Sequence, residues 1–78
     1  MGMTVKVVWE SGEPCTGVHV TAWIDGVANE KVSTNSSGEA HFSYGPGQGT
    51  IYCDGQKVRS GSLSSYERVT YYKGKGYY

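Results

Sequence analysis

The chain has 78 residues, carries no formal net charge at pH 7 and is rich in glycine and tyrosine, with 12 and 7 copies. This length allows one hydrophobic core, and the neutral balance argues against a dedicated nucleic-acid or acidic-membrane binder. Leucine occurs once and alanine three times, so the composition favours strands and turns over helices. We therefore expect one domain over residues 1–78, with an ordered core at about 4–72 and a flexible tail at 73–78.

The N-terminal segment has no apolar run of the kind that a secretory signal needs. No other stretch approaches the roughly 20 apolar residues of a membrane span. As written, the chain is expected in the cytoplasm and without a membrane span. An excised or mature domain would instead be extracytoplasmic, and Met1 and Gly2 could then be foreign to it.

The first two strands are expected at residues 4–9 and 18–24, where β-branched residues recur with a period of two. In the first strand, Val5, Val7 and Trp9 share one face, and Thr4, Lys6 and Val8 share the other. In the second strand the inward residues are Val18, Val20, Ala22 and Ile24, and the outward residues are His19, Thr21 and Trp23.

Five further strands are expected, at residues 27–32, 39–44, 50–53, 56–59 and 66–72, with a loop at 60–65. The inward residues of the fourth and fifth strands are Ala40, Phe42, Tyr44, Ile51 and Cys53. Asp25-Gly26 and Asp54-Gly55 favour tight hairpin turns, in which both central residues have positive φ. Turn signals recur about every eight to twelve residues, which is typical of an all-β sandwich.

Three segments combine turn and core residues in one order: GEPCTGV at 12–18, TNSSGEAHF at 34–42 and GQGTIYCDG at 47–55. This order resembles the carboxypeptidase regulatory-like domain of the transthyretin-like, or prealbumin-like, family. Asn35 stands where that family commonly has aspartate, and Cys15 where it commonly has an apolar residue. The resemblance covers most of the chain, and it implies a seven-strand antiparallel Greek-key sandwich that serves as an accessory, adhesive or linking module without chemistry of its own.

No catalytic or metal-binding arrangement is expected. The histidines, His19 and His41, lie on outward faces of strands expected in opposite sheets, too far apart to share a metal ion. No serine lies on the strand-to-helix turn that presents a catalytic nucleophile. Residues 45–49, GPGQG, precede a strand and not the helix that a phosphate cradle needs. We therefore expect no enzyme activity, no metal and no cofactor.

The two cysteines make sense as small buried hydrophobes. Cys53 points inward in its expected strand, and Cys15 occupies a position that is usually apolar. Cys15 and Cys53 could also form one disulfide, which would contribute roughly 2–4 kcal/mol to so small a core. Free thiols are favoured because the sequence shows no secretory signal.

The main functional feature is aromatic. Trp23 and Tyr52 are expected to project from the outer faces of neighbouring strands, with His19 and Thr21 beside them. Such a pair can anchor a protein partner or stack on a sugar ring, although it could also simply stabilise the sheet. We expect a non-enzymatic interaction or structural module that binds a protein partner or itself, with carbohydrate binding as the alternative.

The C-terminal part of the chain combines cations with tyrosines. Residues 57–78 hold five cations against one glutamate, a net charge of +4, whereas residues 1–56 carry −4. The simplest interpretation is charge complementarity within the sandwich. A basic-aromatic patch could also stack on single-stranded nucleic acid, which is the least favoured partner. Its residues are Arg59, Arg68, Tyr72, Lys73 and Lys75.

Overall fold

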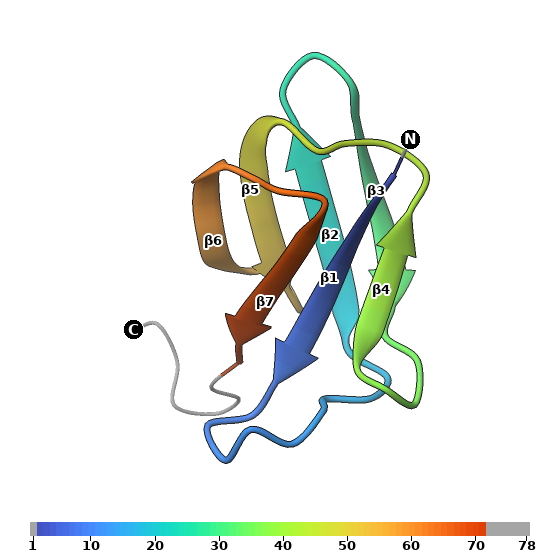
Figure 1. The fold of residues 1–78 in the computed structure, drawn as a ribbon, viewed down its shortest axis with the longest axis vertical. Coiled ribbons are helices and arrows are strands. Elements are labelled where there is room, and N and C mark those ends of the chain that lie inside the picture. Colours follow the sequence, from blue (N-terminus) through green and yellow to red (C-terminus); the bar gives the residue numbers. More distant parts are fainter. Residues whose placement is uncertain (1, 72–78) are drawn as a thin grey trace.

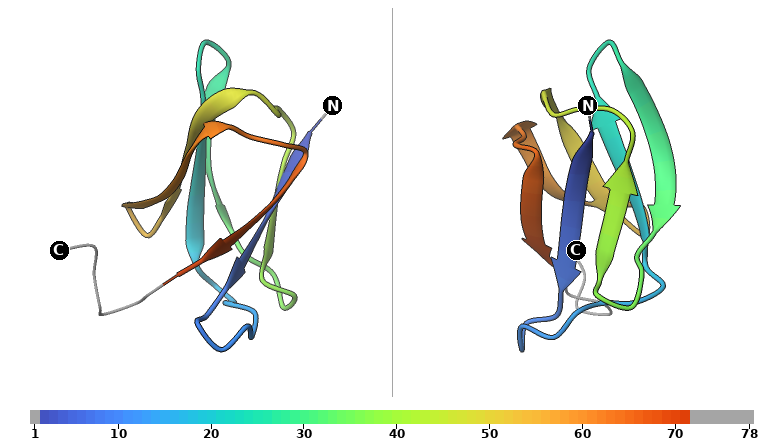
Figure 2. Two further views of the ribbon diagram at one scale, coloured as in Figure 1. Left: turned by 60° about the vertical axis from the view of Figure 1, so that its left-hand side comes forward. Right: turned by 45° about the vertical axis from the view of Figure 1, so that its right-hand side comes forward.

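The protein is an all-β sandwich. The structure, a computed structural model, describes residues 2–71, which form seven strands and no helix. The strands are β1 (Met3–Val8), β2 (His19–Ile24), β3 (Ala28–Ser33), β4 (Glu39–Phe42), β5 (Gln48–Cys53), β6 (Gln56–Ser62) and β7 (Tyr66–Thr70). One sheet has the order β4-β1-β7 and the other the order β3-β2-β5-β6. The two sheets face each other across the core, so the predicted sandwich is confirmed (Figure 1, Figure 2).

The three-stranded sheet is mixed. β1 pairs antiparallel with β4 but parallel with β7, so the expectation of an entirely antiparallel sandwich is wrong for this pair. After β6 the chain crosses from the four-stranded sheet to the other sheet, and β7 then runs beside β1 in the same direction (Figure 1). Parallel neighbours need a long connection between them, which β2 to β6 supply here.

The core consists of alternate residues of the strands. Val20, Ala22 and Ile24 of β2 are at most 3% exposed, and Ile51 and Cys53 of β5 are fully buried. The intervening residues of β2 lie outward, as the alternation predicts. Burying side chains of this kind contributes roughly 1.5–3 kcal/mol each, so this alternation fixes which face of each strand meets the other sheet.

Two aromatic residues that the sequence placed within strands lie just beyond the strand ends. Trp9 follows β1 and is stacked on Tyr71, with ring centroids 5.7 Å apart, while both rings pack on the core. Tyr44 follows β4, and its hydroxyl donates to the Ala22 carbonyl and accepts from the Glu30 N–H. These two hydrogen bonds link the segment that follows β4 to β2 and to the edge strand β3.

The two Asp-Gly pairs form different turns. Asp54 and Gly55 have φ values of 51° and 83° and close a two-residue hairpin between β5 and β6, as predicted. In the β2–β3 hairpin Ile24 pairs with Ala28, so the turn contains three residues and not two. The extra residue, Val27, is 62% exposed.

β6 is longer than the sequence predicts. It extends through Ser62, which pairs with Gln48, so residues 60–62 belong to the strand and not to the expected loop. Residues 60–62 read Ser-Gly-Ser, which offers no apolar alternation to reveal a strand. These residues have a low intrinsic preference for a strand, and hydrogen bonds to β5 hold them in one.

Candidate functional site

The outer face of the four-stranded sheet brings together all four aromatic and polar residues singled out from the sequence. Trp23, Thr21 and His19 alternate with buried residues along β2. Tyr52 of β5 stands directly opposite Thr21. Because β2 and β5 are neighbours, these side chains share one surface.

Trp23 is available on this face for an outside contact. Its side chain is 49% exposed, and its neighbours across the strands are Asn29 and Thr50. Trp23 and Tyr52 do not stack on each other, since the ring pairs of the described residues are Trp9–Tyr71 and Phe42–Tyr44. These two rings therefore do not stabilise the sheet by stacking on each other.

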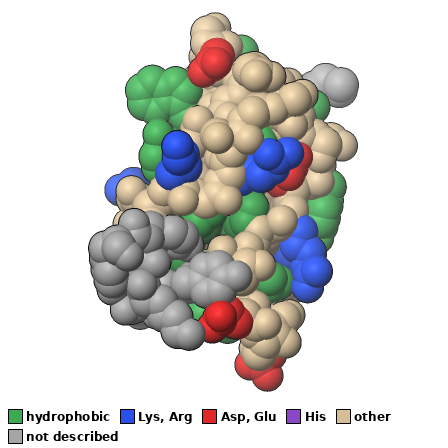
Figure 3. All heavy atoms as spheres, turned by 90° about the vertical axis from the view of Figure 1, so that its left-hand side faces the viewer, with side chains coloured by type: hydrophobic (Ala, Val, Ile, Leu, Met, Phe, Trp, Pro, Cys, Tyr) green, Lys and Arg blue, Asp and Glu red, His purple; other side chains and the backbone are tan. Residues whose placement is uncertain are grey.

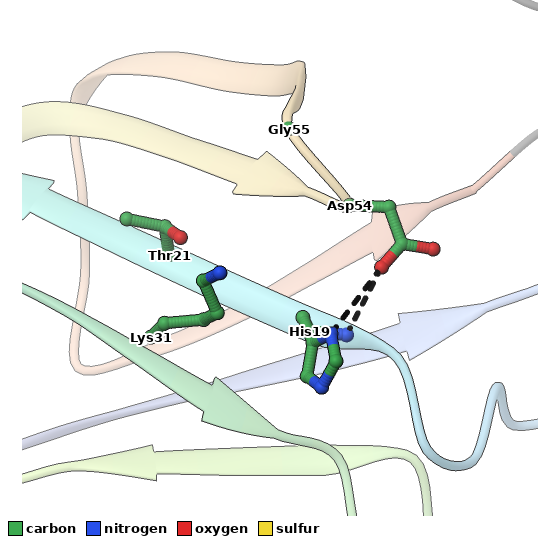
Figure 4. Close-up of a pocket in the computed structure, with 5 residues that line it drawn as sticks. All are labelled: His19, Thr21, Lys31, Asp54 and Gly55. Carbon is green, nitrogen blue, oxygen red and sulfur yellow. Dashed lines mark hydrogen bonds and ion pairs between the residues drawn. The ribbon is translucent and has the colours of Figure 1, made fainter.

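A hollow of about 360 Å³ lies on this face toward the His19 end of β2, beside the β5–β6 turn (Figure 4). Its lining residues are His19, Thr21, Lys31, Asp54 and Gly55. Two of them, His19 and Thr21, were expected at a binding surface, whereas Trp23 and Tyr52 do not line the hollow. The predicted site is thus divided into an aromatic end and a polar hollow.

Asp54 is held in place by two chain segments. One carboxylate oxygen, Oδ1, accepts from the His19 backbone N–H at 3.3 Å and lies 4.0 Å from the ring Nδ1. The other, Oδ2, accepts from the Tyr71 hydroxyl at 2.9 Å. The backbone N–H of Asp54 donates to the His19 carbonyl at 2.8 Å. The carboxylate is therefore fixed at the rim of the hollow.

Lys31 reaches the hollow from the edge strand β3, where it pairs with Thr21. Figure 4 shows its amine lying over β2 on the same side as the Thr21 hydroxyl. The sequence alone gave no reason to single out Lys31, Asp54 or Gly55. The available signal was that Lys31 has the parity of an outward residue and that Asp54, at the start of a turn, has the same parity as the outward Tyr52.

The hollow contains hydrogen-bonding and charged groups but no cluster of metal ligands among its described residues. Within residues 2–71 no three His, Cys, Asp or Glu side chains cluster as metal ligands would. The second histidine, His41, belongs to β4 in the other sheet, where its Nδ1 lies 2.9 Å from the Thr4 hydroxyl. The two imidazoles therefore do not act together.

The basic residues expected to form a patch go to different places. Arg59 of β6 pairs with Glu67 of β7, with 3.3 Å between Nε and Oε1, whereas Arg68 lies on the outer face of the three-stranded sheet next to Lys6. Figure 3 shows the lysine and arginine side chains on the β6 and β7 side separated by uncharged surface. The other proposed members, Tyr72, Lys73 and Lys75, lie outside the described residues.

The Arg59–Glu67 pair joins the two sheets at this edge. Burial alone would raise the pKa of Glu67, but hydrogen bonds from the Ser64 N–H and hydroxyl, together with the Arg59 guanidinium, outweigh it and hold the pKa below its usual range. Glu67 is therefore a structural anion. It fixes the position of Arg59 at the edge where the two sheets meet.

Cys15 and Cys53 are both fully buried and are free thiols in the structure. Burial raises the pKa of Cys53 to about 12, with smaller contributions from Cys15 and from Asp54. Burial also raises the pKa of Cys15. Because the thiolate is the reactive form, neither sulfur has the character of a nucleophile or a metal ligand.

Comparison of the chain with models of protein families and with curated protein sequences gives no match. The family resemblance seen in the sequence therefore stays a prediction. Residues 2–71 contain no helix that is long and apolar enough to cross a membrane. The function must be inferred from the surfaces themselves.

Proposed function

We propose that the chain is a non-enzymatic interaction module and that it docks a protein through the outer face of its four-stranded sheet. The observation that carries this proposal is Trp23, which is half exposed on a regular sheet and has no aromatic partner. Val27, exposed in the adjoining β2–β3 turn, extends the apolar surface at the same end. Tryptophan is enriched among the residues that contribute most of the binding free energy at protein interfaces.

A second copy of the chain is the partner that we consider first. The formal net charge is zero, so two copies do not repel each other as strongly charged proteins do. The opposite charges of residues 1–56 and 57–78 also allow two copies to approach in a complementary orientation. A Trp23 contact at the centre of such an interface would supply most of the binding free energy.

Sedimentation over a wide concentration range tests this proposal. We expect the wild type to dimerise and Trp23→Ala to weaken dimerisation at least tenfold without loss of folding. Tyr66→Ala is the matched control, because Tyr66 is 51% exposed on the outer face of the other sheet. A wild type that remains monomeric at millimolar concentration, or equal weakening by both variants, would contradict self-association through this face.

Carbohydrate binding by Trp23 and Tyr52 is the second candidate, and the hollow is the observation that favours it. Exposed aromatic rings provide stacking surface, and a nearby set of polar groups can bind hydroxyls. Thr21 stands between the two parts of the face, since it pairs with Tyr52 and also lines the hollow. A glycan array would distinguish this function from protein docking.

We also propose that the sandwich has the prealbumin-like Greek-key arrangement of carboxypeptidase regulatory-like domains. The turn within residues 34–42 supports it: Asn35 Oδ1 accepts from the backbone N–H groups of Ser37 and Glu39. Gly38 has φ +76°, and a Cβ there would lie 2.8 Å from the Val7 carbonyl oxygen. These are a side-chain cap on a turn and a close approach that favours glycine, which support the resemblance.

A further inference from the structure

We infer that the hollow is the hydroxyl-binding end of an oligosaccharide site that runs along β2 to Trp23. The inference deepens the carbohydrate candidate and rests on the proposed use of this sheet face. His19 and Trp23 are four residues apart on one strand, which corresponds to roughly 13 Å. Thr21, the nearer lining residue on β2, is two residues or roughly 7 Å from Trp23, so a ligand that reaches from the ring of Trp23 past Thr21 to the His19 end of the hollow is longer than one sugar ring.

The lining of the hollow combines hydrogen-bond donors and acceptors. The Asp54 carboxylate uses one lone pair on each oxygen, for the His19 N–H and the Tyr71 hydroxyl, and keeps others for a ligand. The Thr21 hydroxyl both donates and accepts. The Lys31 ammonium makes no ion pair with any described residue and offers three donors.

This mixture selects a neutral, hydroxyl-rich ligand. Each sugar hydroxyl can donate to Asp54 or accept from Lys31, so one ring can satisfy both without bringing a charge into the hollow. A simple anion would be attracted by Lys31 and repelled by Asp54, and a simple cation the reverse, so the two charges offset each other and neither ion gains a net attraction. A neutral polyhydroxylated ligand meets no such repulsion.

The acceptor is also preorganised. Asp54 is fixed by backbone and side-chain hydrogen bonds before any ligand arrives, and its φ of 51° is imposed by the hairpin turn. A fixed acceptor does not lose rotamer freedom on binding, which favours affinity. Trp23 and Tyr52 then supply the apolar contact for the rest of the ligand.

The experiment uses the full chain on an array of neutral, acidic and amino oligosaccharides of one to six units, followed by calorimetry with the best binder. We expect neutral oligomers of at least two units to bind and the corresponding monosaccharide to bind at least tenfold more weakly. Thr21→Val and Lys31→Met should each reduce affinity at least fivefold. Trp23→Ala should abolish detectable binding, and Tyr66→Ala should leave it unchanged. Thermal unfolding establishes that each variant is folded.

The outcomes separate this inference from the functions on which it rests. If Trp23→Ala loses binding but the hollow variants do not, the hollow is not part of the site, while carbohydrate binding by the aromatic end stands. If the wild type binds no glycan, or binds only charged sugars, the inference is wrong. Self-association through Trp23 is then decided by sedimentation alone.

Discussion

The outer faces of the two sheets differ in how their side chains are paired. On the three-stranded sheet, Glu39 accepts from the Tyr66 hydroxyl at 3.1 Å and lies 3.7 Å from His41, which contacts the Thr4 hydroxyl. On the four-stranded sheet, Trp23 is about as exposed as Tyr66. Its side chain has no hydrogen-bond or ring partner among the described residues. Exposure is therefore similar on the two faces, and the difference between them is that Trp23 has no internal partner within residues 2–71, which is why we propose this face as the binding surface.

The largest expected effect comes from removing the support of the four-stranded face. Gly49 of β5 lies so close to β2 that an added Cβ would be 2.0 Å from the Trp23 carbonyl oxygen and 3.0 Å from the Ile24 Cα. We expect Gly49→Ala to lower the free energy of unfolding by about 3 kcal/mol, because only backbone can give way. Urea denaturation measures this loss.

Gly47→Ala is the control for that substitution. A Cβ at Gly47 would meet only the Ile24 Cγ2, at 3.3 Å, so the side chain can adjust and the loss should be about 1 kcal/mol or less. Similar losses for the two variants would show that Gly49 is not needed for close approach of the strands. Binding through Trp23 should fall with Gly49→Ala in proportion to the unfolded fraction.

The second expected effect concerns the link between the two sheets. Glu67→Gln removes the charge that binds Arg59 and Ser64. We expect the free energy of unfolding at pH 7 to fall by about 1–2 kcal/mol. Because the folded-state pKa of Glu67 is below its ordinary value of 4.5, the stabilisation is complete above pH 4.5 and is lost as pH falls through the lowered value. The difference in free energy of unfolding between wild type and Glu67→Gln should therefore become smaller as the pH falls through that range.

Denaturation at several pH values between neutral and strongly acidic checks both parts of this prediction. Glu13→Gln is a suitable control, because Glu13 is exposed and its side chain has no partner among the described residues. A constant difference between wild type and Glu67→Gln at all pH values would contradict the role assigned to the ionised carboxylate.

A smaller effect is expected on the paired face. Tyr66→Phe removes one exposed hydrogen bond to Glu39, and we expect the free energy of unfolding to change by less than about 0.5 kcal/mol. Neither self-association nor glycan binding should change. A Tyr66→Phe variant that loses binding would show that the three-stranded face, and not the four-stranded face, contacts the partner.

The smallest expected effect is the absence of thiol reaction in the folded protein. Both cysteines are buried, and the pKa of Cys53 is raised to about 12, so maleimide labelling should be negligible at pH 7. In denaturant without reductant, two thiols per chain should react. No labelling until a reductant is added would establish a disulfide between Cys15 and Cys53.

The sequence predicted those features of the fold that depend on local alternation. The faces of β2 followed from seven residues in strict period two, and the Asp54-Gly55 hairpin followed from its requirement for positive φ. The parallel β1–β7 pair could not be predicted, because its register depends on how distant segments meet and not on a local pattern. The end of β6 was missed for a related reason, since residues 60–62 are ordered by pairing with β5.

The candidate site shows the same limit. Trp23 and Tyr52 could be placed on one face from parity alone, and the structure gives that placement. The hollow depends on contacts among β2, β3 and the β5–β6 turn, which bring Lys31 and Asp54 beside His19. A residue known only as a turn former, Asp54, becomes a fixed acceptor because the Tyr71 hydroxyl binds its other oxygen.

The position of β1 has a consequence for how the chain reaches its native state. β1 is the first of the seven strands along the chain, yet it lies at the centre of its sheet and pairs with both β4 and β7. During synthesis one edge of β1 can pair once β4 is available, whereas the other edge stays open until β7 has been made. Contacts between segments this distant in sequence slow folding, and an open apolar strand can pair with other chains in the meantime. Translation speed and chaperone access to Met3–Val8 should accordingly govern the yield of folded protein.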